Sequence, residues 1–433
     1  MSNKPIAICY SPVATRSGYG EMARGFIRNI IDLDRYDLKL ISCNWGGTPL
    51  TALDGNDPND QKIIRHIGNP PFELARQPEV YIHIGIPNEL QPVGKTNIIF
   101  TAGIETNLIS QQWIEFCNKA DAIFAISQHS ANVIRDTKVE IKDQAGNITS
   151  TQVVTKPIEV LHCPLNTNVY KKISSSEIPE SVNDIMFRVK EKFNFLFVGH
   201  WLKGNVGEDR KNVGLLVKLF CETFKKFPAA TRPGLILKTS GAGFSILDRE
   251  EILKKIDTIK DSCGKNTPNV YLVHGNLTEQ EMNGLYNHPK VKVHISLTKG
   301  EGAGLPLLEA TQSEKPVMAS GWSGQLDFLN PDDAILLGGE LKQIDPSAVW
   351  DNILIKESSW FSPDPQFTAN AMLYIFKNYD KFLPGAKKLA LDNAKRFNND
   401  VIKARTIELL DKYIPKYEVA QQVPLILPTL KRL

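Results

Sequence analysis

Two glutamates lie eight positions apart in a glycine-rich segment, Lys299 to Glu309, which reads KGEGAGLPLLE. The segment follows an apolar run that ends near Ser296. A glycine-rich turn between a strand and a helix exposes backbone N–H groups at the positive end of the helix, where a phosphate group can bind. Pro306 suits the first turn of that helix. Glu301 and Glu309 would then face a ligand that carries both hydroxyl and phosphate groups, unless Glu301 only caps the helix and Glu309 is solvated.

A basic pair, Arg210-Lys211, is the second candidate for chemistry. It follows a loop after the predicted strand Phe195–Val198, so it would lie at the carboxyl edge of a parallel sheet, where ligands bind in such folds. A fixed cation there lowers the barrier to departure of a diphosphate, because negative charge develops on that group. The alternative is a solvated helix start, although cations at that position oppose the helix dipole unless an anion is bound.

The elements that must position these residues alternate between short apolar runs and stretches of helical periodicity. Runs at 6–10, 122–126 and 195–198 are followed by helical patterns at 21–31, 130–135 and 213–224. This alternation predicts an α/β fold whose parallel sheets are covered by helices on both faces. The pattern occurs twice, so we expect two Rossmann-like domains, 1–180 and 181–380, and a helical tail, 381–433, that packs back on the first domain.

Composition narrows the class of protein. The chain has 433 residues, enough for two large domains, and its 51 Lys plus Arg against 48 Asp plus Glu give a net charge of only +3. Charge therefore indicates neither nucleic acid nor an anionic membrane as the partner. The six cysteines are scattered without a C-x-x-C pair, no cluster has metal-ligand spacing, and no run approaches the roughly 18 apolar residues that span a bilayer. We expect a cytoplasmic protein without a metal cofactor.

The chain resembles the retaining glycosyltransferases of family 4, which have the GT-B fold of two Rossmann-like domains facing across a cleft. The resemblance rests on the E-x7-E spacing, on Gly18-Tyr19-Gly20 after the first strand, on Val198-Gly199 with Arg210-Lys211-Asn212, and on the helical tail. It implies that Glu309 binds the ribose of a nucleotide diphosphate sugar. It also implies that Glu301 and the backbone of the turn hold the donor sugar and phosphates. The turn residues concerned are Gly302, Ala303, Gly304 and Leu305.

In the family, an arginine and a lysine stabilise the departing diphosphate. Lys211 matches the lysine, but His200 stands after the Val-Gly199 pair where the family usually has arginine. The sequence therefore leaves three candidates for the second donor of positive charge or hydrogen bonds: His200 itself, Arg210, or Lys203 in the same loop.

Further donor contacts follow from the same resemblance. Gly18, Tyr19 and Gly20, which precede the first predicted helix, would face the diphosphate from the opposite domain. The loop His274-Gly-Asn276-Leu277 after the strand Val270–Val273 would meet the base, although a histidine in such a loop is more often a residue with a local hydrogen bond than a catalyst. We expect UDP as the nucleotide.

Two polar segments have weaker assignments. Glu105 and Thr106 follow a predicted strand of the first domain and are candidates for contact with the sugar or the acceptor, or for capping a helix. Trp322 to Asp327 corresponds in the family to a glycine loop near the donor. For Asp327 we favour an ordinary turn closed by Gly321 and Gly324.

The resemblance implies a retaining hexosyl- or pentosyltransferase that moves a sugar to a hydroxyl group, with the leaving phosphate helping to deprotonate the acceptor. Residues 14–20 and 44–49 look like glycosyltransferases of large tailed phages. A modified DNA base is therefore one candidate acceptor, beside polysaccharide, lipid and protein.

Two other functions remain open at this point. One is a sugar-nucleotide-binding protein without turnover, which the histidine at position 200 makes plausible. The other is an NAD-dependent dehydrogenase, because Gly18 to Ala23 fits G-x-G-x-x-A. Against the dehydrogenase, six residues separate the first strand from Gly18, and the next strand ends in Cys43-Asn44 without the acidic residue that binds ribose.

Overall fold

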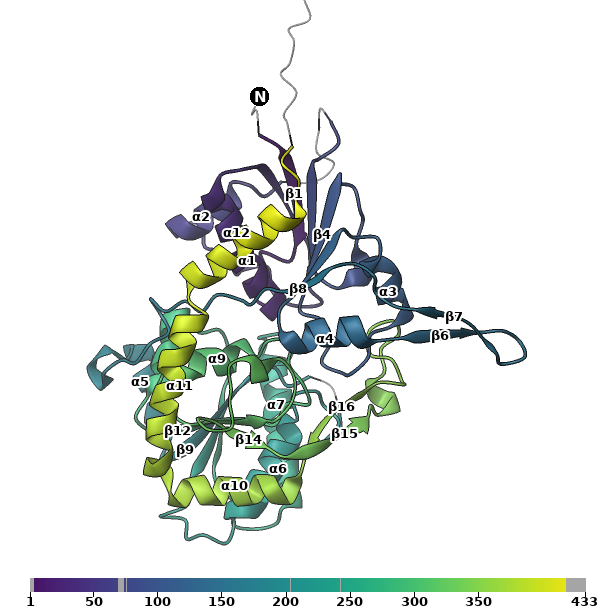
Figure 1. The fold of residues 1–433 in the computed structure, drawn as a ribbon. Coiled ribbons are helices and arrows are strands. Elements are labelled where there is room, and N and C mark those ends of the chain that lie inside the picture. Colours follow the sequence, from purple (N-terminus) through teal and green to yellow (C-terminus); the bar gives the residue numbers. More distant parts are fainter. Residues whose placement is uncertain (1–3, 69–73, 75, 203, 242, 418–433) are drawn as a thin grey trace, which may run out of the picture.

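The computed structural model describes residues 4–68, 74, 76–202, 204–241 and 243–417. Each half of the chain forms one six-stranded sheet in which all neighbouring strands are parallel (Figure 1). Helices cover both sheets, and the two sheets belong to separate units. The α/β fold with two Rossmann-like domains is confirmed.

The first sheet has the strand order β2-β1-β3-β4-β5-β8. Every residue of β3, β4 and β5 is buried, as expected for central strands with helices on both faces. The strands are β1 (Ile6–Ser11), β2 (Asp37–Ser42), β3 (Val80–Ile84), β4 (Thr96–Thr101), β5 (Ala122–Ala125) and β8 (Ile158–Val160). The helices are α1 (Gly18–Leu33), α2 (Pro58–Ile64), α3 (Gln111–Cys117) and α4 (Gln128–Asp136).

The second sheet has the order β11-β10-β9-β12-β13-β14, so the direction of winding reverses between β9 and β12. In open parallel sheets the ligand binds outside the carboxyl ends of the strands at this reversal. The strands are β9 (Asn194–Val198), β10 (Gly234–Lys238), β11 (Val270–Val273), β12 (Val291–Ser296), β13 (Val317–Ser320) and β14 (Ile335–Leu337). The helices are α5 (Glu180–Phe187), α6 (Val213–Phe224), α7 (Ile246–Ser262), α8 (Glu279–Asn287), α9 (Leu305–Thr311) and α10 (Pro365–Lys377).

The last two helices run from one domain to the other (Figure 1). Helix α11 (Leu383–Arg396) packs on α9 of the second domain, whereas α12 (Asn399–Tyr413) packs on α1 of the first. The sequence predicted one helical stretch here. The chain instead breaks at Phe397 and restarts at Asn398, whose side chain caps α12 by accepting a hydrogen bond from the backbone N–H of Val401 at 3.0 Å.

The two chain crossings between the domains lie side by side. After β8 the chain leaves the first domain, and the backbone N–H of Leu165 donates to the carbonyl of Phe397 at 2.7 Å. Leu165, Tyr170 and Ile178 are buried in a core cluster with residues of the second sheet. The segment from Leu165 onwards thus packs with the second domain.

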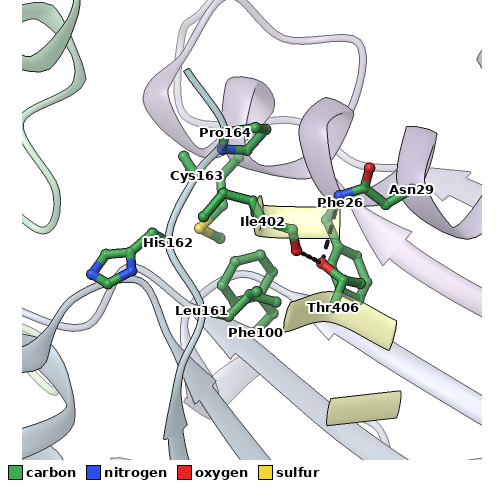
Figure 2. Close-up of a pocket in the computed structure, with 10 residues that line it drawn as sticks. Phe26, Asn29, Phe100, Leu161, His162, Cys163, Pro164, Ile402 and Thr406 are labelled. Atoms are coloured by element: carbon green, nitrogen blue, oxygen red, sulfur yellow. Dashed lines mark hydrogen bonds between the residues drawn. The ribbon is translucent and has the colours of Figure 1, made fainter. Parts of the chain in front are cut away.

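Helix α12 closes a small pocket against α1 and the segment that follows β8 (Figure 2). Asn29 of α1 donates to the Thr406 hydroxyl at 3.5 Å, and that hydroxyl donates to the carbonyl of Ile402 at 2.8 Å. Ile402, Leu409 and Leu410 are buried in the core cluster of the first sheet. Apolar contact therefore fixes α12 to the first domain.

Two antiparallel hairpins were absent from the sequence prediction. One, β6 (Val139–Lys142) with β7 (Ile148–Gln152), projects from the first domain (Figure 1). The other pairs β15 (Gly339–Gln343) with β16 (Ser359–Pro363). Strands β7 and β15 are almost wholly exposed, so their sequences carry no apolar period that would identify them.

Replacing a buried residue of α12 should destabilise the first domain. Leu409 is fully buried, so Leu409→Ala should lower the free energy of unfolding by about 2–5 kcal/mol. Leu391→Ala on α11, where the side chain is 52% exposed, is the matched control and should change it by less than about 0.5 kcal/mol. Urea denaturation measures both, and equal effects would show that α12 does not depend on this contact.

Candidate functional site

The glycine-rich turn lies at the carboxyl end of β12, and α9 begins at Leu305 after it. Gly304 caps the helix with φ of +84°, a left-handed conformation that favours glycine. The segment after β13 fixes the turn by two hydrogen bonds. The backbone N–H of Glu301 donates to the Ser323 hydroxyl at 2.8 Å, and the N–H of Gly324 donates to the Glu301 carbonyl at 3.0 Å. The backbone of the turn is therefore fixed by hydrogen bonds, and its amides lie at the N-terminus of α9.

The structure brings Lys211 and Glu301 together. The Lys211 ammonium lies 2.5 Å from both carboxylate oxygens of Glu301, and both side chains are nearly buried. Lys211 follows β9 and Glu301 follows β12, the two strands at which the winding of the sheet reverses. Burial opposes ionisation of Glu301, but the positive charges of Lys211 and Arg210 outweigh it and hold its pKa below the usual value.

Arg210 points to the other domain. Its guanidinium forms a hydrogen-bonded ion pair with the carboxylate of Glu105, which follows β4 of the first sheet. Burial opposes the charged form of Arg210, but the negative charges of Glu105 and Glu301 outweigh burial and raise its pKa above the usual value. Two cations and two carboxylates thus meet where the domains touch.

His200 is a neutral partner in this cluster. Its Nδ1 lies 3.2 Å from the Ser240 hydroxyl. Burial lowers the pKa of His200, and the charges of Lys211 and Arg210 lower it further. Near neutral pH the imidazole is therefore uncharged. Gly199, just before it, donates its N–H to the carbonyl of Lys238 at 3.1 Å, and Lys203 lies outside the described residues.

Glu309 is only partly exposed, and its side chain has a hydrogen-bond partner, unlike the freely solvated residue of the alternative. The side chain accepts a hydrogen bond from the Tyr286 hydroxyl at 3.1 Å. Burial raises its pKa to about 8, and the negative charges of Glu21 and Glu279 add to this shift. Glu21 belongs to α1 and Glu279 to α8, so the carboxyl of Glu309 senses charges from both domains.

The Gly18–Gly20 segment is the first turn of α1 rather than a loop before it. Ser17 caps the helix by accepting from the N–H of Gly20 at 3.0 Å. A Cβ at Gly20 would lie 2.3 Å from the Thr15 carbonyl oxygen, so close packing explains this glycine. The Tyr19 hydroxyl accepts from the N–H of Ala102 at 3.0 Å, next to the loop that carries Glu105.

The loop after β11 places His274 against α7, 26 positions away, rather than in a hydrogen bond within its own loop. Its Nε2 lies 2.7 Å from a carboxylate oxygen of Asp248, and Asp248 also accepts from the N–H of Gly241 at 3.0 Å. Asn276 is exposed, whereas Leu277 packs against a core cluster. These residues lie at the same sheet edge as the cluster of charges, two strands away from β9.

Thr106 does not point into the cleft. It is fully buried, and its hydroxyl donates to the carbonyl of Leu108 at 3.1 Å. Glu105 alone of this pair reaches the second domain through its side chain.

The interface holds contacts that the sequence did not reveal. Asp327 is more than a turn residue, because its carboxylate accepts from the N–H of Gln128 at 2.8 Å and lies 2.8 Å from Nε2 of His162, both in the first domain. Strand β16 also joins both domains. The N–H of Asn107 in the first domain donates to the carbonyl of Ser359 at 3.0 Å, and two residues later the N–H of Phe361 donates to the carbonyl of Lys299 in the second domain, also at 3.0 Å. No local pattern could have indicated these partners.

A small, largely apolar pocket between the domains lies beside the turn. It is lined by Ile126, His162, Cys163, Ala303, Leu305, Leu308, Gly324, Asp327, Phe328 and Phe397. Among the described residues, no group of three or more His, Cys, Asp or Glu side chains could hold a metal ion. No helix in that part of the chain is long and apolar enough to span a bilayer.

Known structures share this architecture. No protein-family model and no curated protein sequence matches the chain. The chain is similar to HepE from Anabaena in complex with UDP and glucose, with a TM-score of 0.61 and 14% identity over 94% of this chain and 100% of that chain. It is also similar to sucrose-phosphate synthase from Thermosynechococcus elongatus, with a TM-score of 0.59 and 13% identity over 94% of this chain and 98% of that chain.

A glycosyltransferase from Rickettsia africae is a further neighbour, with a TM-score of 0.54 and 12% identity over 96% of this chain and 100% of that chain. At these identities the comparisons establish the fold alone. The chain has the GT-B fold of two Rossmann-like domains.

The raised pKa of Glu309 predicts a pH-dependent stability. The unfolded chain releases this proton near pH 4.5, whereas the folded chain keeps it until about pH 8. Because the folded state binds more protons in this window, the wild type should lose stability relative to Glu309→Gln as pH rises from about 5 to 8. Urea unfolding of both proteins at pH 5, 6.5 and 8 measures the difference, and a difference that stays constant would refute the shift.

Proposed function

We propose that the protein is a retaining glycosyltransferase that moves a hexose or pentose from a UDP-sugar to a hydroxyl acceptor. The observation that carries the proposal is the convergence of Lys211, Arg210 and Glu301 beside a glycine-rich helix start. These groups meet at the point where the winding of the second sheet reverses. This is the position and the chemistry that a pyrophosphate requires.

The donor would span the cleft between the domains. Its diphosphate would meet the ammonium of Lys211, the guanidinium of Arg210 and the amides of residues 302–305. Glu301 would accept hydrogen bonds from the sugar, and Glu309 would bind the ribose. The base would lie at the loop of residues 274–277, and the first turn of α1 would face the diphosphate from the other domain.

Arg210, rather than His200, is the side chain that we propose for the missing arginine. Burial and the positive charges of Lys211 and Arg210 lower the pKa of His200, which disfavours the charged imidazole. Arg210 keeps its charge, and it neighbours Lys211 both in the chain and in the cluster. Two adjacent cations would then neutralise the two phosphates, so the proposal assigns this task to side chains rather than to a metal ion.

In the reaction, the bond between the anomeric carbon and the diphosphate oxygen breaks while the acceptor oxygen bonds to that carbon on the same face. The acceptor proton passes to the departing diphosphate, so no protein nucleophile is needed. Lys211 and Arg210 would stabilise the charge that develops on UDP, and a preorganised cation is worth several kcal/mol in such a site.

The choice of donor is supported by HepE, because that neighbour was solved with UDP and with UDP-glucose. A protein that binds UDP-sugars without turnover is the second candidate, favoured by the neutral histidine at position 200. A thermal-shift panel of nucleoside diphosphates and their sugars tests binding. A ligand at one hundred times its Kd should add about 2.7 kcal/mol of stability. No stabilisation by any nucleotide at millimolar concentration would overturn the proposal.

Lys211→Ala should lower kcat by on the order of a hundredfold or more, because it removes charge that stabilises the transition state. Release of UDP from UDP-glucose measures this rate even without an added acceptor. Lys218→Ala, on the exposed side of α6, is the matched control and should keep the wild-type rate. Equal rates for the two variants would remove Lys211 from the mechanism, and a wild type that binds UDP-glucose without releasing UDP would favour the second candidate.

A further inference from the structure

The loop after β2, residues 43–52, is part of the first domain's cleft edge. It is joined to the loop after β1 by backbone hydrogen bonds at three points. The backbone N–H groups of Cys43 and Ala52 donate to the carbonyls of Ser11 and Ala14, at 3.0 and 3.1 Å. In the other direction, the N–H of Arg16 donates to the carbonyl of Pro49 at 3.0 Å. Ligands of parallel sheets bind outside this carboxyl edge, and we call these paired loops the wall of the first domain.

Trp45 lies on this wall against Tyr19. The two ring centroids are 4.2 Å apart, and the planes are tilted by 37°. The Tyr19 hydroxyl accepts a hydrogen bond from the N–H of Ala102. Ala102 in turn packs against Gly302 of the glycine-rich turn, so closely that a Cβ on Gly302 would lie 2.7 Å from the Ala102 carbonyl oxygen. Trp45 is thus separated from the glycine-rich turn only by Tyr19 and Ala102.

The residues around Trp45 leave one side of its indole ring open to a ligand with an apolar face. The next two residues, Gly46 and Gly47, are exposed and carry no side chain, and Leu50 is 53% exposed. Gly46 takes a left-handed φ of +52°, and a tight turn follows in which Thr48 donates its N–H to the carbonyl of Trp45 at 3.1 Å. The indole is therefore held by Tyr19 and the turn while it stays half-exposed, as a preformed aromatic platform.

Charge separates the classes of acceptor that could use this platform. Residues 43–52 of this wall contain no lysine, arginine, aspartate or glutamate. Arg16, in the loop after β1, donates to the Thr51 hydroxyl at 3.0 Å. A nucleic acid needs several lysines or arginines on its phosphates, so this wall disfavours DNA.

We propose that Trp45 is an acceptor-binding residue and that the acceptor is a neutral carbohydrate. The C–H groups on one face of a sugar ring carry partial positive charge, and they pack on the negative face of an indole. This inference rests on the proposed function, because it names the substrate that receives the sugar.

The test uses the full chain with UDP-glucose and a panel of neutral mono- and disaccharides as acceptors. Transfer is detected by the mass of the product, and release of UDP without acceptor is measured in parallel. We expect at least one sugar to accept glucose. Trp45→Ala should lower kcat/KM for that sugar at least tenfold while UDP affinity and acceptor-free UDP release stay unchanged. Trp45→Phe, which keeps an aromatic face, should recover most of the loss.

Phe187→Ala is the control for removal of an aromatic ring, because this side chain is 87% exposed at the end of α5, and it should have no effect. The inference is overturned if Trp45→Ala transfers like the wild type. It is also overturned if no neutral sugar accepts, or if duplex DNA with hydroxymethylated bases accepts instead. A wild type that neither binds UDP nor releases it from UDP-glucose would refute the proposed function itself, so the two failures are distinguishable.

Discussion

The structure depends on how charge is neutralised where the two domains meet. A buried ion costs several kcal/mol unless a partner of opposite charge is close and well oriented. Lys211 and Arg210 lie side by side, which is unfavourable without anions. Glu301 neutralises the first from within its own domain, and Glu105 neutralises the second from the opposite domain. The ion pair of Arg210 with Glu105 is therefore also a contact between the domains. A diphosphate that replaced Glu105 as the partner of Arg210 would break this contact.

The fold explains why these four side chains converge. Strands β9 and β12 are neighbours at which the winding of the second sheet reverses, so the loops that carry Lys211 and Glu301 leave the sheet together. Strand β16 then fixes the loop of Glu105 to the loop of Glu301, because it is hydrogen-bonded to Asn107 on one side and to Lys299 on the other. His162 and Asp327 form a further polar contact between the domains.

Local pattern was enough to predict the two parallel sheets and to single out the glycine-rich segment. The bounds of α6 and β11 agree with the predicted segments 213–224 and 270–273, because their apolar spacing is unbroken and glycine or proline lies near their ends. The E-x7-E segment was found because all its chemistry lies within eleven consecutive residues. Glu105 and Arg210 are 105 positions apart, and Asp327 meets residues 165 and 199 positions away, so their pairing depends on how two domains dock. The break at Phe397 and the exposed strands β7 and β15 left no periodic signal either.

The account stands on the claim that this charged cluster recognises a diphosphate. Calorimetric titration with uridine, UMP and UDP tests it most directly, because the three ligands differ only in phosphate groups. The account predicts that affinity rises strongly from uridine to UDP and that the gain is lost when Lys211 and Arg210 are both replaced by methionine. Equal binding of all three ligands, or an undiminished preference for UDP in the double variant, would contradict it.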